Sequence, residues 1–182
     1  MEVMTEAVRG ELRGTITSAA AGDEVAFGLI VAAHHDHMRR VCRFITRDDG
    51  LAEDAVQSAW AIAWRKLASL RDPHRLRPWL ISVAANEAKR MARRRRRRLE
   101  VEVAVDADER PGGIDPAAGV SRVDLRRAMA KLSPDDRTLL ALRYVAGFNS
   151  NELAEVTGLS PSGTRVRLAR LLKRLREELD HG

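Results

Sequence analysis

The sequence predicts an all-α protein made of two small helical domains joined by a flexible acidic linker. Apolar residues recur at the spacing of amphipathic helices in several separate segments. Aromatic residues make up only 4% of the 182-residue chain, and runs of β-branched residues, which favour strands, are scarce. A segment near the C-terminus also has the pattern of a helix-turn-helix motif. Together these observations favour helices over sheets.

Charge divides the chain into parts. Residues 89–98 hold eight basic side chains and no acid, whereas residues 99–120 hold six acids and one arginine together with five prolines and glycines. An acidic segment rich in proline and glycine is typical of a flexible linker. We expect a loose or marginally helical N-terminal arm over 1–21, a first domain over 22–98, a linker over 99–121 and a second domain over 122–182.

The first domain carries three predicted amphipathic helices. Asp23 is a candidate N-cap for a helix that runs to about residue 45 and offers for burial Phe27, Ile30, Val31, Met38, Val41, Cys42 and Ile45. A breaker at 47–50 precedes a second helix over about 51–69, with a buried stripe of Val56, Trp60, Ala63 and Leu67. A third helix begins near 76–78 and continues into the basic run, with Leu76, Trp79, Leu80 and Val83 on one side.

The helix-turn-helix pattern covers residues 149–179. Either Asn149 or the serine after it is expected to cap the first helix, and Glu152 stands where a capping box requires it. Gly158 is suited to the positive φ that ends a helix, and Ser160 precedes a proline at the first position of the next helix. In such a motif the second helix lies in the major groove, so duplex DNA is the expected partner.

The second helix of this motif has two faces when residues are placed about 100° apart. The residues expected to pack inward are Leu168, Ala169, Leu171, Leu172, Leu175 and Leu179. The residues expected on the DNA face are Ser162, Gly163, Val166, Arg167, Arg170 and Lys173, with Arg165 at the margin as a phosphate contact. On this face Val166 would meet a thymine methyl, and Arg167 and Arg170 would reach guanine edges or phosphates. A basic surface helix with no role in DNA binding is the alternative.

Composition and motifs exclude several other classes of protein. The formal net charge of +6 favours a polyanionic partner, no stretch is apolar enough to span a membrane, and the N-terminus lacks a secretory signal pattern. The single cysteine, Cys42, fits a buried hydrophobe in a reducing cytoplasm. The histidines at 34, 35 and 37 lack a second cluster that would complete a metal site, and no phosphate loop, catalytic triad or zinc pattern is present. We therefore expect a cytoplasmic protein without enzyme activity, metal or other cofactor.

Segments of both domains resemble the extracytoplasmic-function sigma factors of bacterial RNA polymerase. Residues 22–27 (GDEVAF), 52–67 (AEDAVQSAWAIAWRKL) and 77–80 (RPWL), followed by Ala85-Asn86, resemble region 2 of that family. Residues 132–147 (LSPDDRTLLALRYVAG) and the helix-turn-helix resemble region 4. The resemblance implies two helical domains, binding to core RNA polymerase and recognition of promoter DNA.

In this family the region 2 helix that holds an acidic-Gln segment docks on the clamp helices of the polymerase. The resemblance therefore implies polar polymerase contacts from Asp54, Gln57 and Arg65. Trp60 belongs to the buried stripe, whereas Trp64 is either a core residue or shared between the core and the polymerase interface.

The family uses the next segment and helix to open and read the −10 promoter element, with one base flipped into a pocket. The residues that this resemblance implies are Arg71, His74, Arg75, Arg77, Trp79 and Asn86, with Lys89, Arg90 and Arg93 on the adjacent DNA backbone. This chain lacks the aromatic residue that the family often has just before the Trp-Leu pair. Phosphate contact is the favoured role for the whole arginine run, and a general RNA or membrane-surface patch is the alternative.

The family reads the −35 element with the helix-turn-helix of region 4. Its usual pattern, Gly-Thr-Val, a basic residue, Ser and Arg, corresponds here to residues 162–167, where Val166 replaces a polar reader. A promoter sequence that differs from the usual one is therefore expected. The family's linker threads the active-site cleft and RNA exit path, where an acidic linker would be attracted to a basic channel; an ordinary solvated spacer is the alternative.

These observations predict a sigma factor that binds core RNA polymerase, recognises −35 and −10 promoter elements and helps to melt the DNA. An anti-sigma factor is a further candidate partner. The main alternative is a stand-alone transcriptional regulator whose helix-turn-helix binds an operator, which would leave residues 57–64 and Asn86 without a role. A third hypothesis is a pure interaction module for an anti-sigma protein, for which the basic faces would be dispensable.

Overall fold

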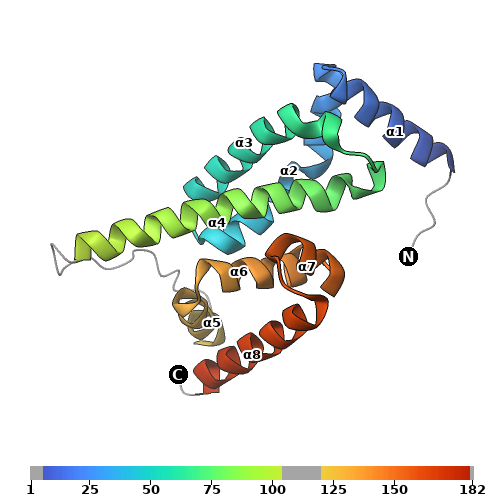
Figure 1. Ribbon diagram of the computed structural model, residues 1–182. Helices are drawn as coiled ribbons and strands as arrows, with labels where there is room; N and C mark the ends of the chain where they lie inside the picture. Colours follow the sequence, from blue (N-terminus) through green and yellow to red (C-terminus); the bar gives the residue numbers. More distant parts are fainter. Residues whose placement is uncertain (1–5, 104–119, 181–182) are drawn as a thin grey trace. The chain divides into compact units, whose positions relative to one another are not determined.

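The computed structural model describes residues 6–103 and 120–180, and every element in these two ranges is helical (Figure 1). The all-α fold class predicted from the sequence is confirmed. Contacts between Cα atoms divide the chain into two compact units, residues 1–88 and 89–182. Each unit contains buried apolar side chains of its own.

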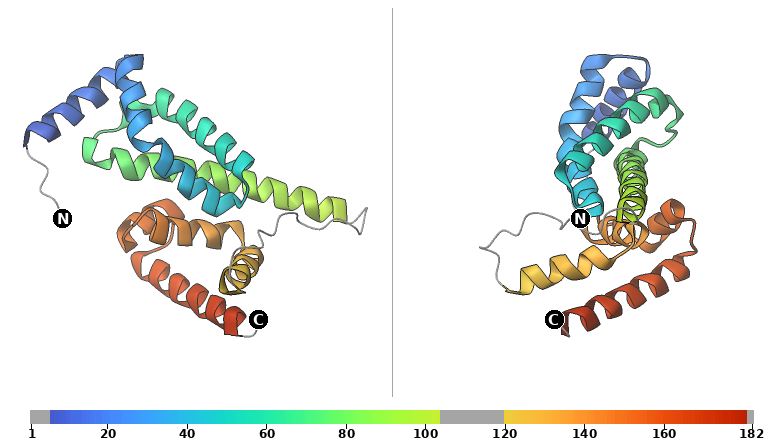
Figure 2. Two further views of the ribbon diagram at one scale, coloured as in Figure 1. Left: turned by 180° about the vertical axis from the view of Figure 1, so that it is seen from behind. Right: turned by 90° about the vertical axis from the view of Figure 1, so that its left-hand side faces the viewer.

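The first unit holds three complete α-helices, two short 3-10 turns (Leu67–Ser69 and Pro73–Arg75) and the start of a fourth α-helix. The α-helices are α1 (Glu6–Ala20), α2 (Glu24–Thr46), α3 (Asp49–Lys66) and the first part of α4 (Leu76–Val103). Helices α2 and α3 pack side by side in opposite directions, the first part of α4 lies along them, and α1 packs on α2 (Figure 1 and Figure 2). The largest fully buried side chains of this unit are Met38, Val41, Ile45, Val56, Leu67, Leu76, Leu80 and Ile81.

Local capping determines where α2 and α3 begin and end. The N-cap predicted at Asp23 is confirmed, because its Oδ1 accepts the backbone N–H groups of Val25 and Ala26 at 2.9 and 3.1 Å. Helix α2 ends at Arg47, which takes the left-handed conformation with φ of 59°. Asp48 then caps α3 by accepting the N–H of Leu51 at 2.8 Å. The predicted break is therefore short, since α3 already includes the last two of its four residues.

The N-terminal segment is more ordered than the sequence indicated. Residues 6–20 form α1, where a loose or marginally helical arm was expected. Two apolar side chains in its last turns, Ile16 and Ala19, are buried. Packing of this end on α2 supplies the stabilisation that a short isolated helix lacks in water.

Helix α4 is longer than expected. It continues through the arginine run to Val103, past the point at residue 99 where the linker was expected to begin. The reason is local, since residues 93–103 contain no glycine or proline and arginine has a high helix propensity. Residues 104–119, which hold most of the predicted linker, lie outside the described residues.

The second unit contains the predicted helix-turn-helix. After the end of α4 it comprises α5 (Val120–Lys131), α6 (Pro134–Leu140), α7 (Ser150–Thr157) and α8 (Pro161–Asp180). A π-helical turn at Ala141–Val145 follows α6 directly, closed by a bond from the N–H of Ala146 to the carbonyl of Ala141 at 2.9 Å. Phe148 is 2% exposed in the segment that leads from this turn to α7, and it is among the largest buried side chains of the unit, with Leu139, Leu142 and Leu153.

Candidate nucleic-acid interface

The turn between α7 and α8 is defined by the residues that the sequence singled out. The side-chain oxygen of Asn149 accepts the N–H groups of Asn151 and Glu152 at 2.9 and 3.1 Å, and the Glu152 carboxylate accepts the N–H of Asn149 at 2.7 Å. This reciprocal pair is the predicted capping box. Gly158 ends α7 with φ of 72° and donates its N–H to the carbonyl of Ala154 at 2.9 Å. Both boundary predictions are confirmed.

The start of α8 is held by two hydroxyl groups. The Ser160 hydroxyl accepts the N–H of Gly163 at 3.0 Å, which confirms the predicted N-cap. Thr164 is completely buried, and its hydroxyl lies 2.8 Å from the carbonyl of Pro161 and 3.4 Å from that of Ser150. Thr164 therefore joins α8 to the beginning of α7. Sequence reasoning did not assign this role, because it depends on a contact between residues 14 positions apart.

The two faces of α8 are largely as predicted. Leu168, Leu171 and Leu175 are buried, and Leu172 is half-buried. On the predicted DNA face, Ser162, Val166, Arg167, Arg170 and Lys173 are exposed, Gly163 is half-buried, and Arg165 at the margin is exposed. Val166 is 50% exposed, so its side chain is available on this face.

Two residues of the predicted inward face are exposed instead. Ala169 is exposed because it lies about 100° around the helix from Leu168, at the edge of the apolar stripe. Leu179 is 37% exposed in the final turn of α8, one residue before the helix ends. The buried stripe is therefore narrower and shorter than the helical wheel predicted.

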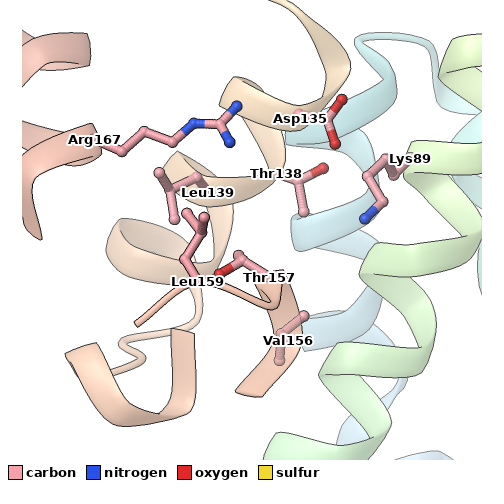
Figure 3. A pocket seen from close by; sticks show the side chains of 8 residues that line it. All are labelled: Lys89, Asp135, Thr138, Leu139, Val156, Thr157, Leu159 and Arg167. Carbon is pink, nitrogen blue, oxygen red and sulfur yellow. The ribbon is translucent and has the colours of Figure 1, made fainter. Parts of the chain in front are cut away.

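Arg167 is held by an acid that the sequence did not identify. Its Nε and Nη2 atoms lie 3.2 and 2.8 Å from Oδ1 of Asp136, which belongs to the first turn of α6. Figure 3 shows the Arg167 side chain reaching from α8 toward α6, beside a small pocket that Leu139 and Leu159 help to line. The Asp136 side chain is only 15% exposed and that of Arg167 is 43% exposed. The pair is therefore partly shielded from water on the acidic side.

The residues implied for the −10 element lie on the turn before α4 and on α4 itself. Arg71, His74, Arg75 and Arg77 are exposed, and Asp72 shapes the turn by accepting the N–H of His74 at 2.9 Å. On α4, helical periodicity places Trp79, Asn86, Lys89, Arg90 and Arg93 along one face. Trp79 and Lys89 are half-buried, whereas Asn86, Arg90 and Arg93 are exposed. This face therefore presents an amide between an indole and a group of cations.

The residues implied for polymerase binding share the outer face of α3. Asp54, Gln57 and Arg65 are exposed, while the opposite face is buried through Ala52, Ala55, Val56, Ala59 and Ala63. Trp64 lies on the outer side at 39% exposure. This face therefore offers a carboxylate, an amide, a guanidinium and part of an indole to a partner.

Phe27 of α2 joins the two tryptophans of α3. Its ring meets Trp64 edge-on with centroids 4.8 Å apart and Trp60 edge-on at 5.7 Å. Trp60 is half-buried and donates its indole N–H to Nδ1 of His35 at 3.4 Å. Trp64 is therefore both a packing residue and a surface residue, whereas Trp60 is the more enclosed of the two.

Burial shifts the pKa values of two side chains of the first unit, Cys42 and His34. Cys42 is completely buried, lies 3.5 Å from the carbonyl of Ala84, and has its pKa raised to about 12 by burial, with smaller effects from Glu53 and Glu87. Burial also lowers the pKa of His34, with further contributions from the charges of Arg77 and His37. Among the described residues no group of three or more potential ligands could hold a metal ion. Nor does any described helix have the length and apolarity needed to cross a membrane.

Comparisons with known proteins match both units. The family model for sigma-70 region 2 matches residues 30–98, and that for sigma-70 region 4 matches residues 122–175. The RNA polymerase sigma factor CarQ of Myxococcus xanthus is 31% identical over 87% of this chain and 91% of its own length. The probable RNA polymerase sigma factor RfaY of Xanthomonas campestris pv. campestris is 35% identical over 92% of this chain, which spans only 44% of that relative's length.

A solved structure extends the agreement to the fold. The structure of CnrH in complex with the cytosolic domain of CnrY matches with a TM-score of 0.66 and 25% identity, covering 93% of this chain and 97% of CnrH. The sequence matches and the fold thus agree with the resemblance inferred from the motifs. The chain belongs to the extracytoplasmic-function sigma factors of the sigma-70 family.

Proposed function

We propose that this protein binds core RNA polymerase in the cytoplasm, directs it to −35 and −10 promoter elements and helps to melt the DNA, with no catalytic residues of its own. The observation that carries the proposal is the helix-turn-helix, whose second helix exposes basic residues on the side opposite its buried leucines. Basic side chains on the outer face of such a helix are suited to bases and phosphates in the major groove. The order of region 2 before region 4 along the chain supports the same function.

Each surface has a proposed partner. The −35 element would meet the exposed face of α8, made of Ser162, Gly163, Arg165, Val166, Arg167, Arg170 and Lys173. The −10 element would meet the turn before α4 and the face of α4 that carries Trp79 and Asn86. Core polymerase would bind the outer face of α3 through Asp54, Gln57, Trp64 and Arg65. These surfaces belong to proposed domains over 22–98 and 122–182, joined by the acidic linker.

An anti-sigma factor is a further proposed partner. The structure of CnrH contains the cytosolic domain of CnrY, and that of RpoE from Bartonella quintana contains the anti-sigma factor NepR. The present chain shares the two-domain helical fold with CnrH over nearly its whole length. A protein that covered the basic face of α8 or the outer face of α3 would block promoter or polymerase binding.

The first test is reconstitution with bacterial core RNA polymerase, followed by transcription from a pool of genomic fragments. The proposal expects a stoichiometric complex that starts RNA at a defined set of sites. If the protein failed to join the polymerase but bound duplex DNA tightly by itself, it would be an operator-binding regulator instead.

Matched variants separate the two surfaces. Arg167→Ala should weaken promoter-specific transcription and leave polymerase affinity intact. Arg176→Ala serves as its control, because Arg176 is also exposed but lies about 180° around the axis of α8 from Arg167. Gln57→Ala combined with Arg65→Ala should weaken polymerase binding, with Lys66→Ala as the control. Equal loss of both activities in a folded Arg167→Ala protein would refute the −35 assignment, and unchanged polymerase affinity in the double variant would refute the docking face.

A further inference from the structure

The contact between Asp136 and Arg167 lies at the base of the proposed −35 reading face. Asp136 sits in the first turn of α6, and Arg167 projects from α8, 31 residues later in the chain. Both Nε and Nη2 of the guanidinium approach a single oxygen, Oδ1, at 3.2 and 2.8 Å. One edge of the guanidinium is thus occupied by an acid from a different helix.

Asp136 is itself fixed in place. Its second oxygen, Oδ2, lies 2.9 Å from the hydroxyl of Ser133, and its backbone N–H donates to the same hydroxyl at 3.1 Å. Ser133 is the N-cap of α6, so the carboxylate lies at the positive end of the helix dipole. The Asp136 side chain is only 15% exposed, so water has little access to the carboxylate. The carboxylate is therefore a rigid anchor and not a mobile surface charge.

The geometry leaves a specific part of Arg167 for DNA. A guanidinium has five N–H donors in one plane, and the Nη1–Nη2 edge carries two parallel donors besides those directed at Asp136. Two parallel donors match the O6 and N7 acceptors of guanine in the major groove. The Arg167 side chain as a whole is 43% exposed, so its own helices do not enclose it and DNA can approach it.

We propose that Asp136 is a positioning residue that makes Arg167 a reader of guanine in the −35 element. The carboxylate holds the guanidinium in one orientation, and its negative charge disfavours approach of a phosphate to the same group. An unanchored arginine on this face would turn toward the DNA backbone, where contacts carry no sequence information. This inference rests on the proposed promoter recognition by α8 and adds the base class that one of its residues selects.

The experiment uses the full chain bound to core RNA polymerase and promoter fragments with a randomised −35 element. Selection with the wild-type protein and with Arg167→Ala identifies the base pair at which Arg167 imposes a guanine preference. Binding is then measured on the fragment with guanine and the fragment with adenine at that position, at several salt concentrations. We expect Asp136→Ala to reduce the guanine preference by about tenfold. The plot of log binding constant against log salt concentration should become steeper by a slope of about one, because the released arginine gains one phosphate contact.

A charge-matched control is available in the same turn. Asp135→Ala removes one negative charge from α6 at the neighbouring position, where the carboxylate is ion-paired with Arg93 of α4 and not with Arg167. It therefore changes a contact outside the −35 face and should leave the guanine preference unchanged. If Asp135→Ala and Asp136→Ala reduced the preference equally, general electrostatics would account for the effect and the positioning role would be overturned. An unchanged preference in Asp136→Ala would overturn it as well.

Arg167→Lys tests the same contact without changing α6. Lysine keeps the charge but cannot bond a carboxylate along one edge and a guanine along another. It should lose the guanine preference, and the loss should not add to that of Asp136→Ala in the double variant. Additive losses, or the absence of any guanine preference due to Arg167, would refute the inference while leaving promoter-specific transcription as evidence for the sigma function. Absence of transcription with the wild-type protein would instead refute the proposed function.

Discussion

At the scale of single residues, His34 couples the stability of the first unit to pH. Burial, and then the charges of Arg77 and His37, lower its pKa in the folded protein. Below about pH 6.5 the unfolded chain therefore binds more protons at this histidine than the folded one, so stability falls as the pH falls. His34→Gln should flatten this dependence when urea unfolding is followed between about pH 7 and pH 5. The exposed His74→Gln is the matched control, and an unchanged slope in His34→Gln would show that another group controls it.

Cys42 illustrates how burial determines reactivity. Its side chain is completely buried and its pKa is raised to about 12, so almost no thiolate forms near neutral pH. We expect a thiol-specific reagent to label the native protein only as fast as the first unit opens, and to label it rapidly in urea. Rapid labelling of the folded protein would contradict the burial of this side chain.

At the scale of elements, one glycine determines the geometry of the helix-turn-helix. Gly158 has φ of 72°, and an added Cβ would meet no other atom within 4 Å, so the cost of Gly158→Ala is backbone strain alone. That cost is about 1 kcal/mol of unfolding free energy. Gly28→Ala in the second turn of α2 also meets nothing within 4 Å, but its helical backbone favours alanine, so it should stabilise by about 0.8 kcal/mol.

The aromatic residues allow these opposite effects to be measured separately. All three tryptophans, Trp60, Trp64 and Trp79, belong to the first unit, whereas the single tyrosine, Tyr144, belongs to the second. Tryptophan fluorescence should therefore follow Gly28→Ala, and far-UV circular dichroism should reveal the earlier loss of helix in Gly158→Ala. Equal shifts of both signals in either variant would indicate that the two units unfold as one.

At the scale of the whole molecule, basic residues are densest in the segment 89–98, where DNA is expected to bind. The exposed arginines at 93–98 form one dense basic segment of α4. Replacing Arg94 and Arg97 by glutamine removes two phosphate contacts, so the slope of log promoter affinity against log salt concentration should become shallower by about two. The base preference should stay intact. Replacing the exposed Arg39 and Arg40 of α2 removes the same charge elsewhere and should change the salt dependence little. Equal effects of the two pairs would mean that only net charge matters.

Much of the fold and of the proposed −35 site could be predicted because it depends on residues close together in the sequence. The capping box of Asn149 and Glu152, the left-handed Gly158 and the cap at Ser160 each involve partners within four positions. The alternation of leucines and arginines along α8 follows from helical periodicity alone. The helix-turn-helix that these local interactions define is one of the segments that resembled the family.

Tertiary structure decided what local patterns cannot encode. Whether residues 6–20 become a helix depends on burial of Ile16 and Ala19 against α2, and Phe27 meets both tryptophans only because α2 packs on α3. The anchoring of Arg167 by Asp136 joins side chains 31 positions apart, and no periodicity within either helix indicates it. The sequence by itself determined most of the helices, the caps of the helix-turn-helix and the family, since helices and caps rest on interactions over one or two turns. Only the packing of one helix on another decided which exposed arginine is held in a fixed orientation, because that depends on the distance between two atoms of different helices.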